Sequence, residues 1–219
     1  KGFIQTSSLA AYQLAEFFKG KDRVQFSKDV QQLAFDLTHP EEFPLPKLQV
    51  KADLRDYQET GVKWLSMLDK YGFGGILADD MGLGKTVITL TALWNLILDS
   101  FEVRKVLVIA PLRVASHTWK SEIDKWEHLK GLDISIAIGS ESERRVALSR
   151  VAFIYTINRE NIVWLIQNHL FDFDMVVIDE LSSFKSYQAK RFKALQKVRF
   201  KIKRMVGLTG TPGNIMDLF

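Results

Sequence analysis

Short runs of apolar residues alternate with amphipathic segments along most of the chain. The apolar runs predict strands at residues 74–78, 105–110, 134–138, 151–155, 175–178 and 205–208. Apolar residues at helical spacing predict helices that begin near residue 54 and that cover residues 87–93, 113–126, 141–149 and 158–169. Nearly continuous aliphatic strands are typical of parallel sheets covered on both faces, and their alternation with helices indicates βαβ units. We therefore predict an α/β fold in which helices sandwich a mostly parallel sheet, with ligands at the carboxyl ends of the strands.

The first fifty residues have a different pattern. Apolar residues at helical spacing predict two amphipathic helices, at residues 6–20 and 27–37. Three prolines follow and prevent a helix from continuing, so we place a boundary between residues 38 and 50. Residues 1–50 are thus predicted to be a helical segment with a linker, and residues 51–219 to form one main domain.

Composition narrows the possible functions. The chain has 219 residues, of which 47% are hydrophobic, so it can bury one sizeable core. Its 30 basic and 26 acidic residues give a net charge of +4, which permits a nucleic-acid partner without requiring one. It has no cysteine and four scattered histidines, so disulfides and thiolate metal sites are excluded, and any metal should be Mg²⁺ arriving with a nucleotide. The longest apolar run, at residues 87–98, is too short to span a bilayer, so we expect a soluble, intracellular protein with no membrane partner.

A glycine-rich stretch follows the first predicted strand of the main domain. Gly82 and Gly84 allow backbone N–H groups to turn toward phosphate oxygens, and the next helix adds the positive end of its dipole. Lys85 could reach the β and γ phosphates, and the Thr86 hydroxyl could ligate Mg²⁺. The match to the pattern G-x-x-x-x-G-K-[ST] is partial, because Asp79 stands at the first glycine. For this motif alone, an ordinary turn with a solvated lysine is the alternative.

Three further features fit a nucleotide site. Asp179 and Glu180 end an apolar strand, where the first carboxylate could hold Mg²⁺ and the second could polarise an attacking water. The strand at 205–208 ends in hydroxyl and glycine residues, which could hydrogen-bond to the acidic pair and report whether the nucleotide is intact. Gln58 offers a donor and an acceptor for the edge of adenine. Each feature alone has an ordinary alternative: the acidic pair could open a surface loop, the end of the strand at 205–208 could be a simple turn, and Gln58 could be a surface residue. Their occurrence together and in this order favours a nucleotide site.

These residues resemble the first RecA-like lobe of superfamily-two helicases, in the Swi/Snf ATPase branch, as found in bacteria and phages. Residues 54–58 resemble the Q motif, 80–86 motif I, 110–114 motif Ia, 155–158 motif Ib, 179–180 motif II and 208–212 motif III. The resemblance covers about residues 50–219, and the family commonly replaces the first glycine of the loop. Two departures stand out: Leu181 and Ser182 follow the acidic pair where the family more often has a histidine at the fourth position, and the segment after Pro212 is about two residues shorter.

The resemblance implies a P-loop NTPase lobe that uses ATP and Mg²⁺. It assigns ATP binding to Gln58, Met81, Gly82, Leu83, Gly84, Lys85 and Thr86; Mg²⁺ to Thr86 and Asp179; catalysis to Glu180, Lys85 and Asp179; coupling to Thr209, Gly210 and Thr211; and contacts with DNA phosphates to Arg113, Thr156 and Asn158. It implies a cytoplasmic protein that translocates on double-stranded DNA and remodels protein–DNA complexes, with a DNA-bound protein as its target.

The resemblance also leads us to expect a second RecA-like lobe, with its arginine finger, that this chain does not contain. A fragment of this kind should hydrolyse ATP very slowly. Two other functions stay open from the residues. A strand-separating helicase would share this lobe, and a nucleotide-binding module without turnover would also fit one lobe.

Overall fold

The protein is built around one six-stranded sheet, seen in the computed structural model, which describes residues 10–13, 26–45, 52–80, 82–184 and 190–210. The strands are β1 (Gly75–Ala78), β2 (Val106–Ala110), β3 (Ile134–Ala137), β4 (Ile154–Asn158), β5 (Met175–Asp179) and β6 (Arg204–Thr209). Their order across the sheet is β1-β6-β5-β2-β4-β3, and every pairing is parallel. The predicted α/β class and parallel sheet are therefore confirmed.

One strand lies further along the chain than predicted. The run at residues 151–155 predicts a strand that starts at Val151, yet β4 begins at Ile154 and ends at Asn158. Val151 is 99% exposed, because the chain is still turning at the amino edge of the sheet. Pairing with β2, in which Val106 faces Ile154, sets where β4 starts. The shift matters for the site, because it makes Asn158 the last residue of the strand.

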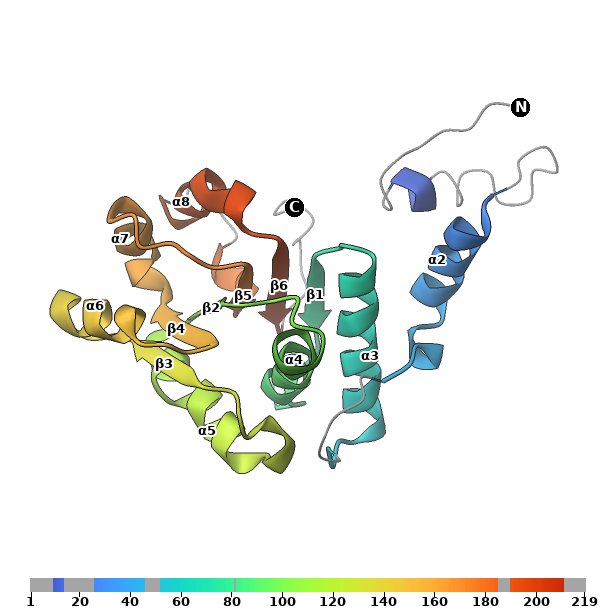
Figure 1. Cartoon of the computed structure of the whole chain (residues 1–219), viewed down its shortest axis with the longest axis horizontal. Coiled ribbons are helices and arrows are strands. Elements are labelled where there is room, and N and C mark those ends of the chain that lie inside the picture. The colour runs from blue at the N-terminus through green and yellow to red at the C-terminus, as the bar shows by residue number, and fades with distance from the viewer. Residues whose placement is uncertain (1–9, 14–25, 46–51, 81, 185–189, 211–219) are drawn as a thin grey trace.

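The first face of the sheet is covered by helices that lie on either side of β1 and β2 in the sequence (Figure 1). They are α3 (Asp56–Lys70), α4 (Lys85–Trp94) with the π-helical turn η2 (Asn95–Asp99), and α5 (Trp119–Lys125), flanked by η3 (Val114–Thr118) and η4 (Glu127–Leu129). Residues 87–94 of α4 are all buried, which explains why all of them except Thr89 and Thr91 are apolar. Val106, Val108 and Ala110 of β2 point into this layer.

The second face carries the remaining helices of the main domain (Figure 1). They are α6 (Glu141–Ser149), α7 (Ile162–Gln167) and α8 (Lys190–Val198), with the 3-10 turns η5 (Arg159–Asn161), η6 (Leu181–Phe184) and η7 (Arg199–Lys201). Leu107 and Ile109 of β2 alternate to this side and meet Leu165 of α7 and Leu195 of α8. Because β2 is buried on both faces, its side chains are apolar throughout.

The N-terminal segment packs against α3. It contains α2 (Lys28–Thr38) and η1 (Pro40–Glu42), and the Ser27 hydroxyl accepts a hydrogen bond from the Val30 N–H at the start of α2. The Asp36 carboxylate accepts a 2.6 Å hydrogen bond from the Tyr71 hydroxyl, and burial together with this bond raises the pKa of Tyr71. Of the helix predicted at residues 6–20, only residues 10–13 are described, and they are helical. The division at residue 50 stays a prediction.

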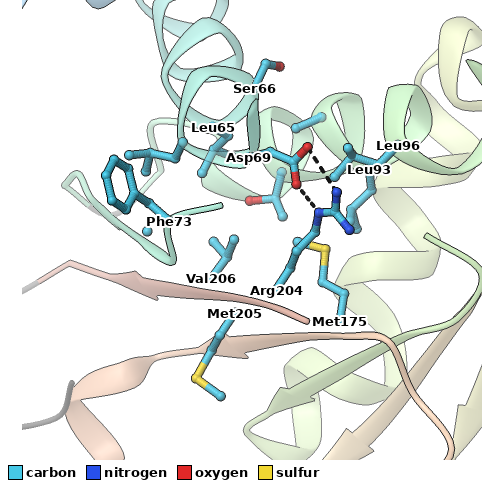
Figure 2. A pocket seen from close by; sticks show the side chains of 14 residues that line it. Leu65, Ser66, Asp69, Phe73, Leu93, Leu96, Met175, Arg204, Met205 and Val206 are labelled. Atoms are coloured by element: carbon cyan, nitrogen blue, oxygen red, sulfur yellow. Dashed lines mark hydrogen bonds and ion pairs between the residues drawn. The ribbon is translucent and has the colours of Figure 1, made fainter. Parts of the chain in front are cut away.

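A small cavity lies at the amino end of the sheet, between α3, α4 and β6 (Figure 2). Its volume is about 20 Å³, enough for one water molecule. Arg204 reaches across its polar end and donates to the Asp69 carboxylate. It also donates to the Glu102 carboxylate. This cavity lies at the amino ends of the strands, whereas the glycine-rich loop lies at their carboxyl ends. The cavity therefore plays no part in the site described next. None of the helices that the structure describes is long and apolar enough to cross a membrane.

Candidate nucleotide-binding site

The sheet brings the predicted site residues together at the carboxyl ends of its strands. β1 lies beside β6, with Ala78 opposite Thr209, and β6 lies beside β5, with Leu208 opposite Asp179. Because all three strands are parallel, their carboxyl ends are neighbours. The glycine-rich loop that follows β1, the acidic pair that ends β5 and the hydroxyl that ends β6 therefore converge, although the loop and β6 are far apart in the sequence.

The loop between β1 and α4 has the backbone of a phosphate cradle. Gly82 and Gly84 have φ angles of +84° and +83°, a region that favours glycine. The Lys85 ammonium group folds back over the loop and donates to the carbonyl oxygens of Asp79, at 2.7 Å, and of Asp80, at 2.8 Å. A phosphate in the loop would offer this cation a charged partner in place of two neutral ones. Met81 lies outside the described residues.

Gln58 joins the start of α3 to this loop. Its side chain is buried; Oε1 accepts a 3.0 Å hydrogen bond from the Arg55 N–H, and Nε2 donates to the Leu83 carbonyl at 3.4 Å. A Cβ atom at Gly84 would lie 2.5 Å from Nε2, so the loop and the amide fit closely. The amide oxygen can still accept, and the amide nitrogen can still donate, one further hydrogen bond. Adenine could use these two positions, so its recognition by Gln58 stays a prediction. The contact with the loop is a second role, which the sequence did not indicate.

Asp179 is the less exposed carboxylate of the acidic pair, and Trp119 holds it. The indole Nε1 of Trp119, which is fully buried on α5, donates a 3.0 Å hydrogen bond to Asp179 Oδ2. Burial raises the pKa of Asp179, partly offset by the Trp119 hydrogen bond, the Glu180 backbone N–H and the positive charge of Lys85. Sequence reasoning missed Trp119, because an indole in an amphipathic helix is usually only a core residue.

Glu180 follows in a strained backbone conformation. Its φ angle is +60°, which is uncommon for a residue with a side chain and tends to mark functional sites. The carboxylate is about half exposed and lies 3.8 Å from the Arg159 guanidinium, which also pairs with Glu160 at 3.0 Å. Glu180 is thus turned out of the strand toward solvent, while Asp179 is turned inward. Arg159 is a second residue that sequence reasoning did not single out.

An apolar contact links the acidic pair to β6. Leu181 is buried, and a Cβ atom at Gly207 would lie 2.6 Å from its Cδ2 atom. Residues 181–182 differ from the family pattern, yet the turn that they form after the acidic pair still packs on β6. Of the three predicted coupling residues, Thr209 is buried at the end of β6, Gly210 follows it, and Thr211 lies outside the described residues.

The predicted DNA-contacting residues differ in their exposure. Arg113 is exposed just beyond the carboxyl end of β2, and Asn158 ends the neighbouring strand β4. Asn158 is mostly buried and bonds to Glu160 and Asn161, with distances of 3.0 and 2.6 Å. Thr156 is fully buried, and its hydroxyl donates to the Ala115 carbonyl at 2.7 Å. Its assignment to a DNA phosphate is therefore a correction: both faces of β4 are covered, so this side chain lies in the core.

The fold and the site define a P-loop NTPase lobe of RecA-like architecture. Comparison with known families makes this specific: residues 57–215 match the SNF2-related domain. The chain belongs to this family of SNF2 ATPases, which confirms the resemblance seen in its motifs.

Proteins of phages, bacteria and fungi are similar to the chain. Protein p41 of Acyrthosiphon pisum secondary endosymbiont phage 1 is 42% identical over 149 residues, which cover 64% of this chain and 32% of the phage protein. An uncharacterized ATP-dependent helicase of Mycoplasma genitalium is 35% identical over 176 residues, covering 76% of this chain and 16% of the helicase. The TATA-binding protein-associated factor mot1 of Schizosaccharomyces pombe is 32% identical over 201 residues, covering 82% of this chain and 10% of that factor.

Solved structures agree with these relatives. The Sulfolobus solfataricus SWI2/SNF2 ATPase core in complex with dsDNA superposes with a TM-score of 0.65 at 31% identity, covering 80% of this chain and 36% of that one. The SWI2/SNF2 ATPase core domain of the same organism gives a TM-score of 0.59 at 31% identity, covering 78% of this chain and 34% of that one. The chain thus spans about a third or less of the length of the relatives that it matches.

Proposed function

We propose that the chain is the ATP-binding lobe of a DNA-dependent ATPase that translocates on double-stranded DNA and remodels protein–DNA complexes. One observation carries the proposal: the loop of Gly82 and Gly84 lies at the same sheet edge as Asp179 and Glu180, and the charge of Lys85 acts on Asp179. Membership of the SNF2-related family and likeness to an ATPase core solved with dsDNA support it.

The residues present fit ATP with Mg²⁺. The loop offers backbone N–H groups and a lysine for phosphates, and Thr86 and Asp179 supply a hydroxyl and a carboxylate as oxygen ligands. Among the described residues, no group of three or more His, Asp or Glu side chains could hold a metal ion, which suits an ion that takes its other ligands from phosphates and water. When bound, Mg²⁺ would neutralise charge on the phosphate oxygens.

The two carboxylates of the acidic pair have different roles because their surroundings differ. Asp179 is held inward by Trp119, so it can keep a fixed oxygen beside the phosphate loop. Glu180 is turned outward by its positive φ angle, so it can accept a proton from a water molecule near the γ phosphate. Thr209 and Gly210 end the strand that packs on Leu181, and through this contact they could couple the state of the nucleotide to motion.

The DNA contact is assigned to the carboxyl ends of β2 and β4. Arg113 and Asn158 lie there, beside the nucleotide edge, and Arg113 is exposed and can meet a phosphate group. A DNA-bound protein is the expected target, and the second RecA-like lobe is the expected partner in turnover. Both follow from the family and remain parts of this proposal.

Calorimetry with ADP and Mg²⁺ tests the proposal. Lys85→Ala should weaken binding strongly, because it removes the cation of the phosphate loop. Lys63→Ala is a matched control, since the Lys63 ammonium bonds the Glu41 carbonyl, far from the loop in the sequence and outside the site. Equal affinity in wild type and Lys85→Ala would show that the loop is not a phosphate site.

A further inference from the structure

The positive charge of the protein is concentrated in one segment. Residues 190–203, which form α8, η7 and the approach to β6, contain seven basic residues and no acidic one. The remaining 23 basic and 26 acidic residues would give a net charge of −3. The overall charge of +4 therefore comes from this segment alone, which the proposed function does not use.

Helical spacing gathers part of this charge into a stripe. Ala194, Leu195 and Val198 form the buried side of α8, whereas Lys190, Lys193 and Lys197 are exposed. Spacings of three and four residues place the three lysines on one side of the helix, over a length of about 10 Å. We call these three residues the α8 lysine stripe. It continues past the end of α8 into Arg199, Lys201 and Lys203, which are also exposed.

Among the residues that the structure describes, the α8 lysine stripe differs from the other charged helices because its cations have no acidic partners. On α5, η4 and α6, exposed cations pair with acids three or four residues away, as in Lys120 with Asp124 at 2.5 Å and Arg145 with Glu141 at 2.8 Å. Within the described part of the chain, no carboxylate forms an ion pair with any lysine of the stripe. Like charges at this spacing repel one another, so an anionic partner would stabilise the helix.

We propose that the α8 lysine stripe contacts the phosphates of double-stranded DNA. Phosphates follow one another every 3.4 Å of axis along one strand, so a stripe of about 10 Å matches about three of them. The stripe is separate from Arg113 and Asn158: those residues lie at the carboxyl ends of β2 and β4, whereas α8 lies on the second face of the sheet and leads to the amino end of β6 (Figure 1). The protein thus offers DNA a second contact surface.

The test compares two triple variants with the same change in net charge. In one, Lys190, Lys193 and Lys197 are replaced by glutamine; in the other, Lys120, Lys125 and Lys130, which pair with acids on α5 and η4, are replaced. Binding of a short fluorescent duplex is measured by anisotropy over a range of salt concentrations, using the whole chain. The slope of log affinity against log salt falls by about 0.9 for each phosphate that the protein no longer neutralises, hence by up to about 2.7 in the first variant.

The expected result is a reduced slope and weaker binding in the first variant, and an unchanged slope in the second. Equal reductions in both variants would mean that only net charge matters, and an unchanged first variant would mean that the stripe does not touch DNA; either result overturns the inference. Binding to anionic vesicles is measured in parallel, and a first variant that binds DNA normally but vesicles weakly would assign the stripe to a lipid surface instead. Arg113→Ala and ADP affinity report on the proposed function, so its failure is distinguishable from failure of this inference.

Discussion

Replacing Trp119 by phenylalanine tests how the site holds the Asp179 carboxylate. The substitution keeps an aromatic ring in the core but removes the N–H that donates to Asp179. A hydrogen bond to a charged group contributes about 1.5–3 kcal/mol to stability. With the small cavity that the shorter ring leaves, we expect the free energy of unfolding to fall by about 2–4 kcal/mol.

The functional effect should appear in the use of Mg²⁺. A group that orients a metal ligand typically contributes about 10–100-fold to metal affinity. We therefore expect the gain in affinity for a fluorescent ADP analogue on adding Mg²⁺ to shrink by about that factor in Trp119→Phe, while affinity measured in EDTA stays near that of the wild type.

Trp126→Phe supplies the matched control. The Trp126 indole also donates to a carboxylate, Glu122, at 2.8 Å, but it does so at the end of α5, away from the nucleotide edge. Because it also removes a hydrogen bond to a charged group, this variant should lose about 1.5–3 kcal/mol of stability, yet it should keep the full Mg²⁺ effect. If Trp119→Phe loses stability yet keeps the wild-type gain from Mg²⁺, Trp119 is a packing residue only and its role in holding the metal ligand is refuted.

Three further outcomes are expected. Gly84→Ala should cost about 1–2 kcal/mol of backbone strain and should also weaken nucleotide binding, because the new Cβ atom pushes the Gln58 amide off the loop. Gly72→Ala, at φ +71° with open space around it, should cost the strain alone. Denaturant unfolding measures the strain and calorimetry measures nucleotide affinity; an equal change of affinity in both variants would contradict this prediction. Burial lowers the pKa of His128 below its usual 6.5, so the unfolded chain binds the extra proton first: stability should be full above about pH 6.5 and decline as the pH falls below it, and His128→Gln should flatten that decline in denaturant titrations. Residues 1–219 alone should release phosphate from ATP very slowly, with little stimulation by duplex DNA. The family resemblance places the arginine finger in a second lobe, and such an arginine contributes about 10³–10⁵ to kcat. Robust DNA-stimulated turnover by residues 1–219 that disappears in Glu180→Gln would contradict the expectation that turnover needs the second lobe.

The sequence alone determined the class of fold and the family. Strands such as β2 are aliphatic at every position because both faces are covered, and this pattern is local enough to be seen without a structure. Glycines before a lysine and threonine, and two carboxylates after an apolar strand, are likewise short motifs whose chemistry depends on neighbouring residues. The family match over residues 57–215 confirms the family resemblance drawn from them.

The tertiary structure decided which side chains meet. The hydrogen bond from Trp119 to Asp179 joins residues 60 positions apart, and the contact of Gln58 with Leu83 joins two segments that the sequence assigned to separate tasks. Thr156 looked like a DNA contact from its motif, but helices cover both faces of β4, so its side chain lies in the core. Such facts depend on strand order and on which face each residue takes, and these follow from the packing of the whole sheet, because no short run of residues carries the positions of its distant neighbours.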